Sequence, residues 1–128
     1  MNITVKEMLA EANAVIDTVS VHDAIAYYND VDVVFIDLRD ERERTENGEI
    51  PGAVHVSRGH LEFQADPEMP LHNPIFASGK NLILYCASGG RSTLSAKTLV
   101  DMGVPNVSHI AGGFAAWCEA GGPTQSAE

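Results

Sequence analysis

The sequence has few cysteines and few positive charges, and it lacks any long hydrophobic run. Its 128 residues include two cysteines, and eight lysines and arginines stand against eighteen aspartates and glutamates. The resulting net charge of −10 opposes binding to nucleic acid or to an anionic membrane. No apolar run approaches the ~18 residues that a membrane-spanning helix needs, and residues 1–6 lack the basic and then apolar pattern of a signal peptide. We therefore expect a cytoplasmic protein that binds neither nucleic acid nor membranes.

The scarcity of cysteine also limits disulfide and metal chemistry. Cys86 and Cys118 form one disulfide at most, and a reducing compartment argues against that bond. His55 lies in a predicted strand between Val54 and Val56, which favours a packed, hydrogen-bonded imidazole over a catalytic base. The other histidines have no metal-ligand spacing with the cysteines, so we expect no metal site. These scattered residues are His22, His60, His72 and His109.

The residues that are present fit one compact α/β domain. A length of 128 residues and an apolar content of 45% suffice for a single hydrophobic core. Extended and helical segments alternate along the chain, without repeats or low-complexity tracts. Five short strands interleaved with helices predict a mostly parallel sheet that helices cover on both faces. We expect one domain over residues 1–128, with an extra N-terminal helix at about 4–13.

Apolar spacing and capping residues set the boundaries of the predicted elements. Thr4 begins the N-terminal helix like a capping box, and Ser20 caps the next helix. Gly48 fits the C-terminal cap of a charged helix over 40–47, and prolines keep the region 67–74 irregular. The predicted strands are 18–20, 33–36, 53–56, 81–85 and 107–110. The predicted helices are 4–13, 20–29, 40–47, 61–65, 92–102 and 113–120.

Cys86 stands between a predicted buried strand and a predicted helix, which is where open α/β sheets bind ligands. Gly89 and Gly90 follow it, and they allow successive N–H groups to converge on one anionic atom. The helix adds the positive end of its dipole, and Arg91 adds a charge. A free cysteine is only about 3% thiolate at pH 7, and these features favour the thiolate. The pattern predicts a nucleophilic cysteine, and a buried structural thiol is the alternative.

The segment around Cys86 resembles the active-site loop of the rhodanese (sulfurtransferase) domain, in which four residues separate a cysteine from an arginine. Two further segments resemble the signatures of that family in the expected order. One runs through 35–40 and continues through 48–55, and the other is 112–117. Together they extend the resemblance over about 20–123. It implies the rhodanese fold, an α/β fold with a five-stranded, mostly parallel sheet and helices on both faces.

The resemblance also implies a sulfurtransferase that works by covalent relay through Cys86. The cysteine takes sulfane sulfur from thiosulfate or another persulfide donor, and its persulfide passes the sulfur to a thiol or cyanide acceptor. Donor and acceptor are small molecules or proteins, and no cofactor is required. Many relatives that use thiosulfate carry a basic residue at the position of Ala87, so a protein or small-molecule persulfide is an alternative donor. The expected substrate-binding residues are Ala87, Ser88, Gly89, Gly90, Arg91 and Ser92.

Two other functional classes stay open on the sequence. Phosphatases and arsenate reductases of related fold also use a cysteine loop that ends in arginine, but with five intervening residues where this chain has four. The shorter loop makes a tighter cradle, which suits one or two sulfur atoms better than a tetrahedral oxyanion. The other class is a non-catalytic binding or regulatory module on the same scaffold. Such modules often lose the cysteine, which this chain keeps.

Asp37 and Arg39 end a predicted strand on the ligand-binding side of the sheet. We expect both to support the site, with Asp37 either accepting hydrogen bonds from amides of the Cys86 loop or forming a structural ion pair. Further positive potential for an anionic donor could come from Arg42, Arg44 and Arg58. The alternation of Arg42 and Arg44 with glutamates instead favours a solvated, charge-compensated surface.

The last predicted helix carries residues to which we assign no chemistry. Phe114 and Trp117 lie three apart, which predicts that both side chains pack into the core. Cys118 follows them without a recognisable activating neighbour, and we expect an inert thiol there.

Overall fold

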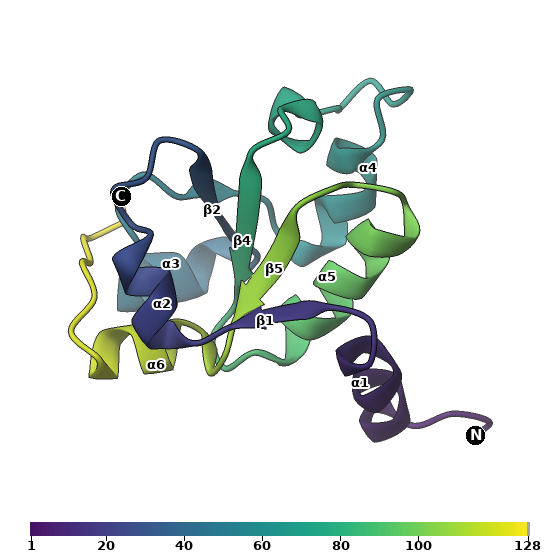
Figure 1. Ribbon diagram of the computed structural model, residues 1–128, viewed down its shortest axis with the longest axis horizontal. Coiled ribbons are helices and arrows are strands. Elements are labelled where there is room, and N and C mark those ends of the chain that lie inside the picture. Colours follow the sequence, from purple (N-terminus) through teal and green to yellow (C-terminus); the bar gives the residue numbers. More distant parts are fainter. Residues whose placement is uncertain (128) are drawn as a thin grey trace.

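Five strands form a single sheet in the computed structural model, which describes residues 1–127; Glu128, the last residue of the predicted domain, lies outside the described residues. The strand order is β1-β5-β4-β2-β3, and every pairing between neighbouring strands is parallel (Figure 1). The strands are β1 (Asp17–Val19), β2 (Val33–Asp37), β3 (Val54–His55), β4 (Asn81–Tyr85) and β5 (Val107–Ile110). The predicted α/β architecture is confirmed.

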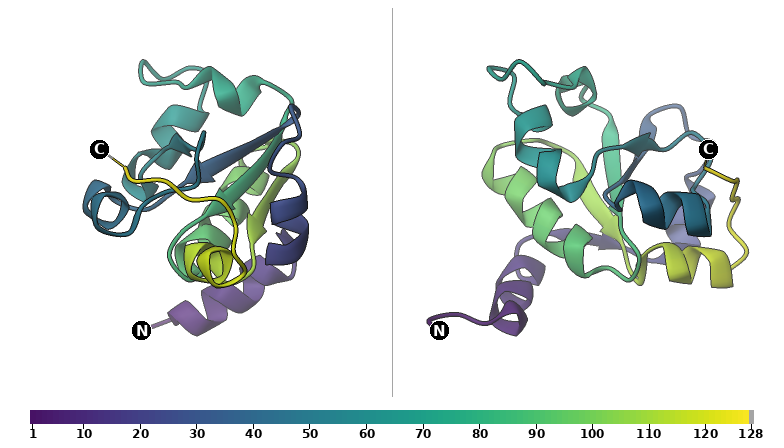
Figure 2. Two further views of the ribbon diagram at one scale, coloured as in Figure 1. Left: turned by 90° about the vertical axis from the view of Figure 1, so that its left-hand side faces the viewer. Right: turned by 180° about the vertical axis from the view of Figure 1, so that it is seen from behind.

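The helices lie on both sides of this sheet, as Figures 1 and 2 show. Two short 3₁₀ turns, η1 and η2, flank α4 in the long connection between β3 and β4. The helices are α1 (Val5–Asn13), α2 (Val21–Ala26), α3 (Glu41–Asn47), α4 (Leu61–Ala65), α5 (Gly90–Asp101) and α6 (Gly113–Glu119), and the turns are η1 (Arg58–His60) and η2 (Pro74–Ala77). Within residues 1–127 no helix is long and apolar enough to cross a membrane.

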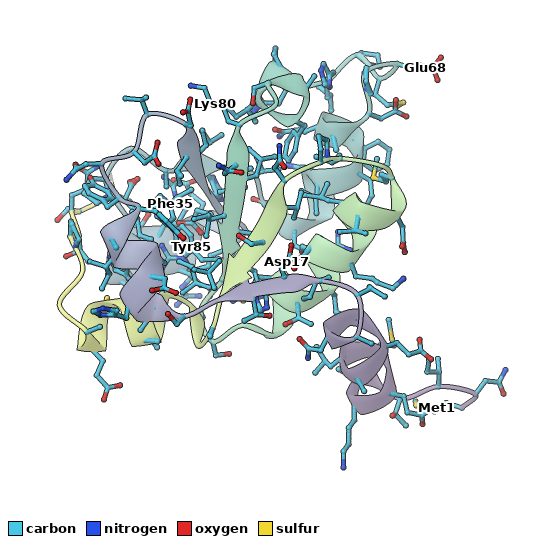
Figure 3. The ribbon with its side chains drawn as sticks, viewed as in Figure 1. Met1, Asp17, Phe35, Glu68, Lys80 and Tyr85 are labelled. Carbon is cyan, nitrogen blue, oxygen red and sulfur yellow. The ribbon has the colours of Figure 1, made fainter. Side chains whose placement is uncertain are left out.

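Alternating side chains of the central strand β4 divide the core into two layers. Leu82 and Leu84 join the cluster under α4 and α5, whereas Ile83 and Tyr85 join the cluster under α2 and α6. In Figure 3, Tyr85 and Phe35 of β2 lie together on the side of α2. These four side chains are buried, whereas Asn81 at the start of β4 is exposed, because a parallel strand covered on both faces has no solvent side along its covered length.

Side-chain caps begin three of the helices. Thr4, Ser20 and Asp40 each accept a hydrogen bond from the backbone N–H three residues on, and Asp40 completes a capping box with Glu43. The predicted extra helix is present as α1, which packs against α5. These local signals explain why most element boundaries match the prediction within a few residues.

The start of α5 differs from the prediction by two residues. The sequence predicts a helix from Ser92, but α5 begins at Gly90 with Gly89 as its N-cap. Gly89 has φ +114°, a left-handed conformation that favours glycine, and it turns the chain sharply enough for the helix to begin at once. The hydroxyl of Thr93 donates to the Gly89 carbonyl over 2.7 Å, which anchors this turn.

The C-terminal segment returns to the turn between α3 and β3 (Figure 2). Glu49 and Gln125 exchange two backbone hydrogen bonds of 2.8 and 3.0 Å. The indole N–H of Trp117 donates to the Pro123 carbonyl over 2.7 Å and holds the intervening chain against α6. The turn beside α3 is therefore fixed from both sides.

Candidate functional site

Cys86 directly follows β4, at the carboxyl edge of the sheet, and its side chain is buried. In the neighbouring strand β2, Asp37 pairs in register with Tyr85, so the ends of both strands lie side by side. The loop from Cys86 to Gly89 then enters α5. The sheet thus brings the predicted cysteine loop and the predicted Asp37–Arg39 segment together at one edge, as ligand sites of open parallel sheets require.

Two backbone donors converge on the sulfur of Cys86, and the Ser92 hydroxyl oxygen lies within reach of its thiol proton. The backbone N–H of Gly89 lies 3.2 Å from Sγ and that of Ser92 lies 3.4 Å from it. The Ser92 hydroxyl oxygen is 3.6 Å away. Amide dipoles aimed at one atom, together with the first turn of a helix, stabilise negative charge at that atom. The arrangement can hold a thiolate, or the inner sulfur of a persulfide, without a metal or a positively charged side chain.

The remaining predicted loop residues lie at the mouth of this cradle. Ser88 and Gly90 are exposed, and Ala87 is half-buried. Gly90 supplies the first residue of α5, and no atom lies within 4 Å of the position that a Cβ would take there. Ala87 and Ser88 contribute no hydrogen bond to the sulfur of Cys86, so the donors come from the far end of the loop.

The N-terminus of α6 closes the loop from the other side. The N–H groups of Phe114 and Ala115 donate to the carbonyls of Cys86 and Ala87 over 2.8 and 3.1 Å. Gly113 makes this approach possible, since a Cβ there would lie 2.7 Å from the Cys86 carbonyl oxygen. Phe114 and Trp117 are buried, which confirms their predicted packing. The last predicted motif therefore shapes the cysteine loop through its backbone.

Asp37 forms a buried ion pair with Arg39, which is the second of the two roles expected for it. Its carboxylate accepts three hydrogen bonds of 2.8 to 3.0 Å from the Arg39 backbone and guanidinium. A fourth bond comes from the Tyr85 hydroxyl over 2.7 Å. Among the described residues, no amide of the Cys86 loop bonds to Asp37, so the alternative of direct loop hydrogen bonds is wrong. Asp37 instead fixes Tyr85, the residue before Cys86.

The buried pair of Asp37 and Arg39 changes the pKa of Arg39 itself and that of the neighbouring Tyr85. Burial raises the pKa of the Tyr85 hydroxyl, and the neighbouring charge of Asp37 raises it further. Burial opposes the charge of Arg39, but its hydrogen bonds and attraction to Asp37 prevail and raise its pKa. The guanidinium of Arg39 also lies 4.2 Å from the centre of the Phe114 ring. The cation is thus fully engaged within the protein.

Arg91 points to a carboxylate of α3. Its guanidinium donates to both oxygens of Glu43 over 2.6 and 2.8 Å. The hydrogen bonds from Arg91 lower the pKa of Glu43 to about 2, so that this carboxylate stays ionised throughout the neutral range. The alternation of arginines and glutamates predicted a solvated surface for this segment, because a separation of 48 residues hides the contact between Glu43 and Arg91.

The three other arginines differ in their surroundings. Arg42 is exposed and pairs with Glu46, in agreement with the predicted charge-compensated surface, and the half-buried Arg58 pairs with Glu62. Arg44 contradicts that prediction, since its side chain is only 13% exposed. It contacts Glu49, Asp37 and His55 because α3 folds back over the end of β2. Helical alternation with glutamates did not reveal this burial.

His55 has the packed role predicted for it. Its Nε2 lies 2.6 Å from the carbonyl oxygen of Arg39, and its Nδ1 lies 3.2 Å from a guanidinium nitrogen of Arg44. These contacts tie β3 to the segment that follows β2. His55 therefore supports Arg39 and Arg44 and forms no hydrogen bond with the sulfur of Cys86.

His109 is the residue of this region that the sequence analysis missed. Its Nδ1 lies 2.9 Å from the Ser92 hydroxyl oxygen, and burial lowers the pKa of the imidazole. The available signal was strand alternation, because His109 lies two residues after Val107, which packs in the core cluster of α5. Its contact with the cysteine loop requires the non-local pairing of β4 and β5.

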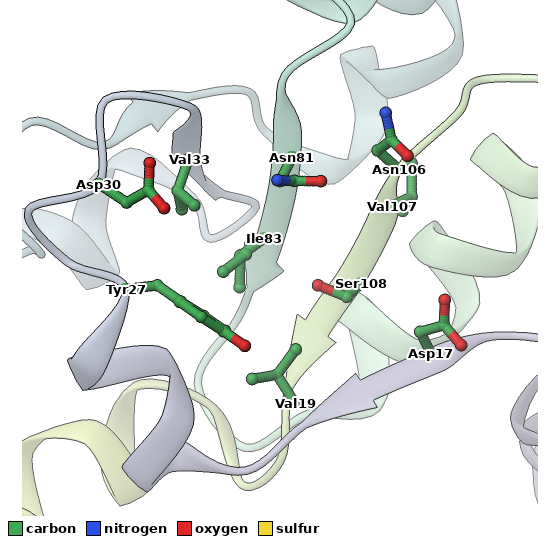
Figure 4. A pocket seen from close by; sticks show the side chains of 10 residues that line it. All are labelled: Asp17, Val19, Tyr27, Asp30, Val33, Asn81, Ile83, Asn106, Val107 and Ser108. Atoms are coloured by element: carbon green, nitrogen blue, oxygen red, sulfur yellow. The ribbon is translucent and has the colours of Figure 1, made fainter.

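Two cavities bear on access to the site. One of about 330 Å³ borders the loop and the start of α6, and its lining includes Arg39, Ala87, Phe114 and Cys118. A second cavity, of about 380 Å³, lies on the sheet between α2 and β1; its lining includes Val19, Ile83 and Ser108 of three strands and does not include Cys86 (Figure 4). The first cavity is the one placed to admit a ligand to the loop.

Cys118 is exposed in that first cavity, whereas Cys86 is buried, and both thiols are free. Within residues 1–127, no group of three or more histidine, cysteine, aspartate or glutamate side chains is placed to hold a metal ion. The chemistry that the geometry offers is that of a shielded sulfur anion.

The sequence profile of the Rhodanese-like domain family matches residues 20–120. The chain belongs to this family. A curated relative, thiosulfate sulfurtransferase 16 of Arabidopsis thaliana, is 31% identical over 96 residues, which cover 72% of this chain and 79% of the relative. The chain spans only 27% and 60% of two further curated relatives. Sulfur transfer is therefore supported at the level of the family.

Solved structures of rhodanese-like proteins share the fold. A protein of unknown function from Rhodopseudomonas palustris, described as a possible tyrosine phosphatase, aligns with a TM-score of 0.95 and 48% identity over 98% of this chain and 96% of its own. The polysulfide-sulfur transferase homodimer of Wolinella succinogenes aligns with a TM-score of 0.71 and 27% identity over 96% and 88%. The similarity extends across α1 as well as the sheet.

Proposed function

We propose that this protein is a sulfurtransferase that carries sulfane sulfur as a persulfide on Cys86. The observation that carries the proposal is the convergence of the Gly89 and Ser92 N–H groups on the buried sulfur. Such a cradle stabilises the thiolate before reaction and the persulfide after it. Membership of the Rhodanese-like domain family supports the same chemistry.

The reaction proceeds in two half-reactions. In the first, the Cys86 thiolate forms a bond to the outer sulfur of the donor, and the bond between that sulfur and the rest of the donor breaks. The leaving group takes the bonding electron pair and departs as sulfite or as a thiolate. In the second, a thiolate or cyanide acceptor attacks the outer sulfur of the persulfide and releases the Cys86 thiolate. No cofactor enters either step, and the kinetics are ping-pong.

In the part of the chain that the structure describes, the loop offers no free cation to a sulfonate group, which favours a donor without one, a persulfide or a polysulfide, over thiosulfate. Arg39 and Arg91 are each held by a carboxylate through two guanidinium hydrogen bonds, and Arg44 is paired with Glu49. None of these pairs leaves a full positive charge for the sulfonate end of thiosulfate, and Ala87 supplies none. The structurally similar protein from Wolinella succinogenes is a polysulfide-sulfur transferase, which supports this donor class.

The setting of the reaction follows from the same features. A cytoplasmic location fits two free cysteines, because a reducing compartment preserves the thiol on which the reaction depends. We treat residues 1–128 as one functional domain in which α1 supports α5, the helix behind the loop. The partners are a sulfur donor and a thiol acceptor, each a small molecule or a protein.

A phosphatase is the second candidate, because the structurally similar protein from Rhodopseudomonas palustris is described as a possible tyrosine phosphatase. Its catalysis would require the arginine of the loop to bind a phosphate. Here Arg91 gives two hydrogen bonds to Glu43 instead, and the four-residue loop leaves a small cradle. These features favour sulfur transfer over phosphate-ester hydrolysis.

The test compares wild-type protein with Cys86→Ser and with Cys118→Ser as the matched control. Each protein is treated with a polysulfide or with thiosulfate and examined by intact-mass and peptide mass spectrometry. We expect wild type and Cys118→Ser to gain one sulfur atom on the peptide of Cys86, with faster loading from polysulfide, and Cys86→Ser to gain none. Turnover of an aryl phosphate that depends on Cys86, without sulfur loading, would establish the phosphatase instead.

A non-catalytic module would give a different result in the same experiment. It would either fail to load Cys86 or hold the sulfur without passing it to cyanide or to a small thiol. Release of the sulfur as thiocyanate from the loaded protein therefore separates an enzyme from a binding module.

A further inference from the structure

A continuous row of polar contacts links Cys86 to the surface at the edge of the sheet. The sulfur lies 3.6 Å from the Ser92 hydroxyl oxygen, which lies 2.9 Å from Nδ1 of His109. On the other side of the ring, Nε2 lies 3.1 Å from the hydroxyl oxygen of Thr18. Thr18 belongs to β1, an edge strand, and is exposed. The other members of the row, Cys86, Ser92 and His109, are buried.

A buried thiol must lose its proton before it reacts, and this row is a route by which the proton can leave. Cys86 is 1% exposed and Ser92 is fully buried, so neither exchanges protons with bulk water directly. Each hydroxyl along the row donates one proton and accepts another, and a neutral imidazole donates from one nitrogen and accepts at the other. Burial lowers the pKa of His109, which keeps its ring neutral and able to do both.

We propose that Ser92, His109 and Thr18 form a proton path that connects the Cys86 thiol with solvent. The inference rests on the proposed function, because it concerns the formation of the thiolate that attacks the sulfur donor. Ser92 and His109 act here as positioning residues that relay a proton, and neither forms a bond to the donor.

The protons balance along the path. In the thiol state, Cys86 donates to Ser92, Ser92 donates to Nδ1 of His109, and the Nε2–H group donates to Thr18. On ionisation, the thiol proton moves to Ser92, the hydroxyl proton of Ser92 moves to Nδ1, the Nε2 proton moves to Thr18, and the hydroxyl proton of Thr18 passes to water. One proton leaves, and every hydrogen bond reverses. His109 is neutral before and after, but its tautomer has changed.

The groups around the His109 ring make its tautomer depend on the protonation state of Cys86. On β4 the residue in register with His109 is the apolar Leu84, and on β1 it is Thr18. On α5 the facing residue is Ser92, and the neighbouring Arg91 is paired with Glu43. Asp17, the first residue of β1, lines the cavity of Figure 4. Among residues 1–127, Cys86 is thus the ionisable group joined to His109 through hydrogen bonds, by way of Ser92.

A purely structural role makes a different prediction. The Ser92 hydroxyl also lies 3.2 Å from the Gly89 carbonyl oxygen. If Ser92 donated permanently to that carbonyl, His109 would keep its proton on Nδ1 whatever the state of Cys86. The tautomer of His109 therefore distinguishes a relay from a fixed brace.

The first experiment observes the ring nitrogens of His109 by ¹⁵N NMR in the full chain while the pH is raised. The signals are assigned by their loss in His109→Gln. We expect the proton to move from Nε2 to Nδ1 at the pH midpoint of Cys86 alkylation, and we expect no such change in Cys86→Ser. A single tautomer through the whole titration, or a positively charged His109, would overturn the proposal. The result needs no sulfur donor, so it is independent of the proposed enzymatic activity.

The second experiment measures the rate of persulfide formation in Thr18→Val and His109→Gln. Valine has the shape of threonine and Thr18 is exposed, so Thr18→Val is expected to fold. It therefore keeps the test valid if His109→Gln does not fold. Below the alkylation midpoint, we expect both variants to load sulfur on the order of 100-fold more slowly than wild type, the scale of a lost proton transfer. Above it, the rates converge because the thiolate is already formed.

The matched control is His60→Gln, since His60 is an exposed residue of η1 and makes no contact with this row. It is expected to load sulfur at the wild-type rate at every pH. Equal rates for wild type, Thr18→Val and His109→Gln across the pH range would show that the thiol proton leaves by another route. Absence of loading in all proteins, wild type included, would count against the proposed function and leave the NMR result to decide on the path.

Discussion

At the scale of single residues, the environment of Cys86 comes mainly from backbone groups. Two amides supply the closest contacts to its sulfur, and Arg91 is bound to Glu43. Backbone donors are held by the fold of the loop and need no reorganisation when charge develops on sulfur. Side chains around the loop should therefore adjust the reactivity of Cys86, and none of them should be able to replace the cysteine itself.

Arg91→Ala is expected to slow sulfur loading about tenfold, the effect of roughly one charge-assisted contact. The loss is partial because the amides remain and because Glu43 already offsets much of the positive charge. Arg91→Lys should restore only part of the rate, since an ammonium cannot form the two parallel bonds to Glu43. Loading rates and the pH profile of Cys86 alkylation measure both effects, with Arg42→Ala as the control on an exposed arginine. Wild-type values in Arg91→Ala would mean that the amide cradle acts alone.

Cys118→Ala is expected to keep full turnover. The thiol lies in the cavity beside Ala87, but the proposed chemistry needs only the sulfur of Cys86. Steady-state sulfur transfer to cyanide and to a small thiol measures this outcome. If loading of Cys86 stayed normal while transfer to the acceptor failed, Cys118 would be the residue that receives the sulfur.

At the scale of secondary-structure elements, three segments determine the shape of the loop. Strand β4 delivers Cys86 to the edge of the sheet, α5 supplies the amides, and the start of α6 binds the carbonyls of Cys86 and Ala87. The close approach of α6 depends on Gly113, which has φ +64° and no room for a Cβ. A change at this glycine acts on the loop without touching the sulfur.

Gly113→Ala is expected to destabilise the fold by roughly 1–3 kcal/mol and to lower the rate of sulfur loading in the protein that remains folded. The added Cβ would meet the Cys86 carbonyl oxygen at 2.7 Å and displace the loop. Gly121→Ala is the matched control, because Gly121 also has a positive φ, of +80°, but no atom lies within 4 Å of a Cβ there. Denaturant unfolding and loading rates should separate backbone strain, present in both variants, from displacement of the loop, present in one.

Local sequence signals predicted the elements of this fold better than they predicted the contacts between them. The apolar run of β4 and the caps at Thr4 and Ser20 lie within a few residues of the features that they indicate. The partners of the site come from distant segments. Glu43 and Arg91 are 48 residues apart, and Ser92 and His109 are 17 apart, and the order of strands brings each pair together.

The errors in the site prediction have the same origin. Arg44 alternates with glutamates as a surface residue does, yet α3 folds over the end of β2 and buries it. Asp37 was expected to bond either to the loop amides or to an arginine, and only the packed structure decides for Arg39. A sequence pattern describes one element at a time, whereas the burial and the partners of these side chains depend on the element that packs against them.

At the scale of the whole molecule, one ion pair joins two helices that the hydrophobic layers do not connect. The pair of Glu43 and Arg91 links α3 to α5 across the mouth of the loop, whereas the pair of Asp37 and Arg39 lies within one segment at the end of β2. With a net charge of −10, the chain repels itself at neutral pH, so an attractive contact between distant elements offsets part of that repulsion. Acidification should therefore act on specific pairs as well as on the overall charge.

Glu43→Gln is expected to lower stability at neutral pH and to reduce the loss of stability on acidification. The pKa of Glu43 is lowered from its ordinary value of 4.5 to about 2, chiefly by its hydrogen bonds to Arg91. A carboxylate with a lowered pKa contributes stability that is fully present above about pH 4.5 and is lost as the pH falls through about 2. The variant lacks this contribution at every pH, so its stability should fall less steeply between these two values.

The measurement is denaturant unfolding of both proteins at a series of pH values from neutral to about 2, the lower end set by the pKa of Glu43. Glu46→Gln is the matched control, because it makes the same charge change on the same helix, where Glu46 is 58% exposed and pairs with the exposed Arg42. An exposed pair contributes little, so this control should follow the wild-type curve. Parallel curves for wild type and Glu43→Gln would mean that the link between α3 and α5 adds nothing to stability.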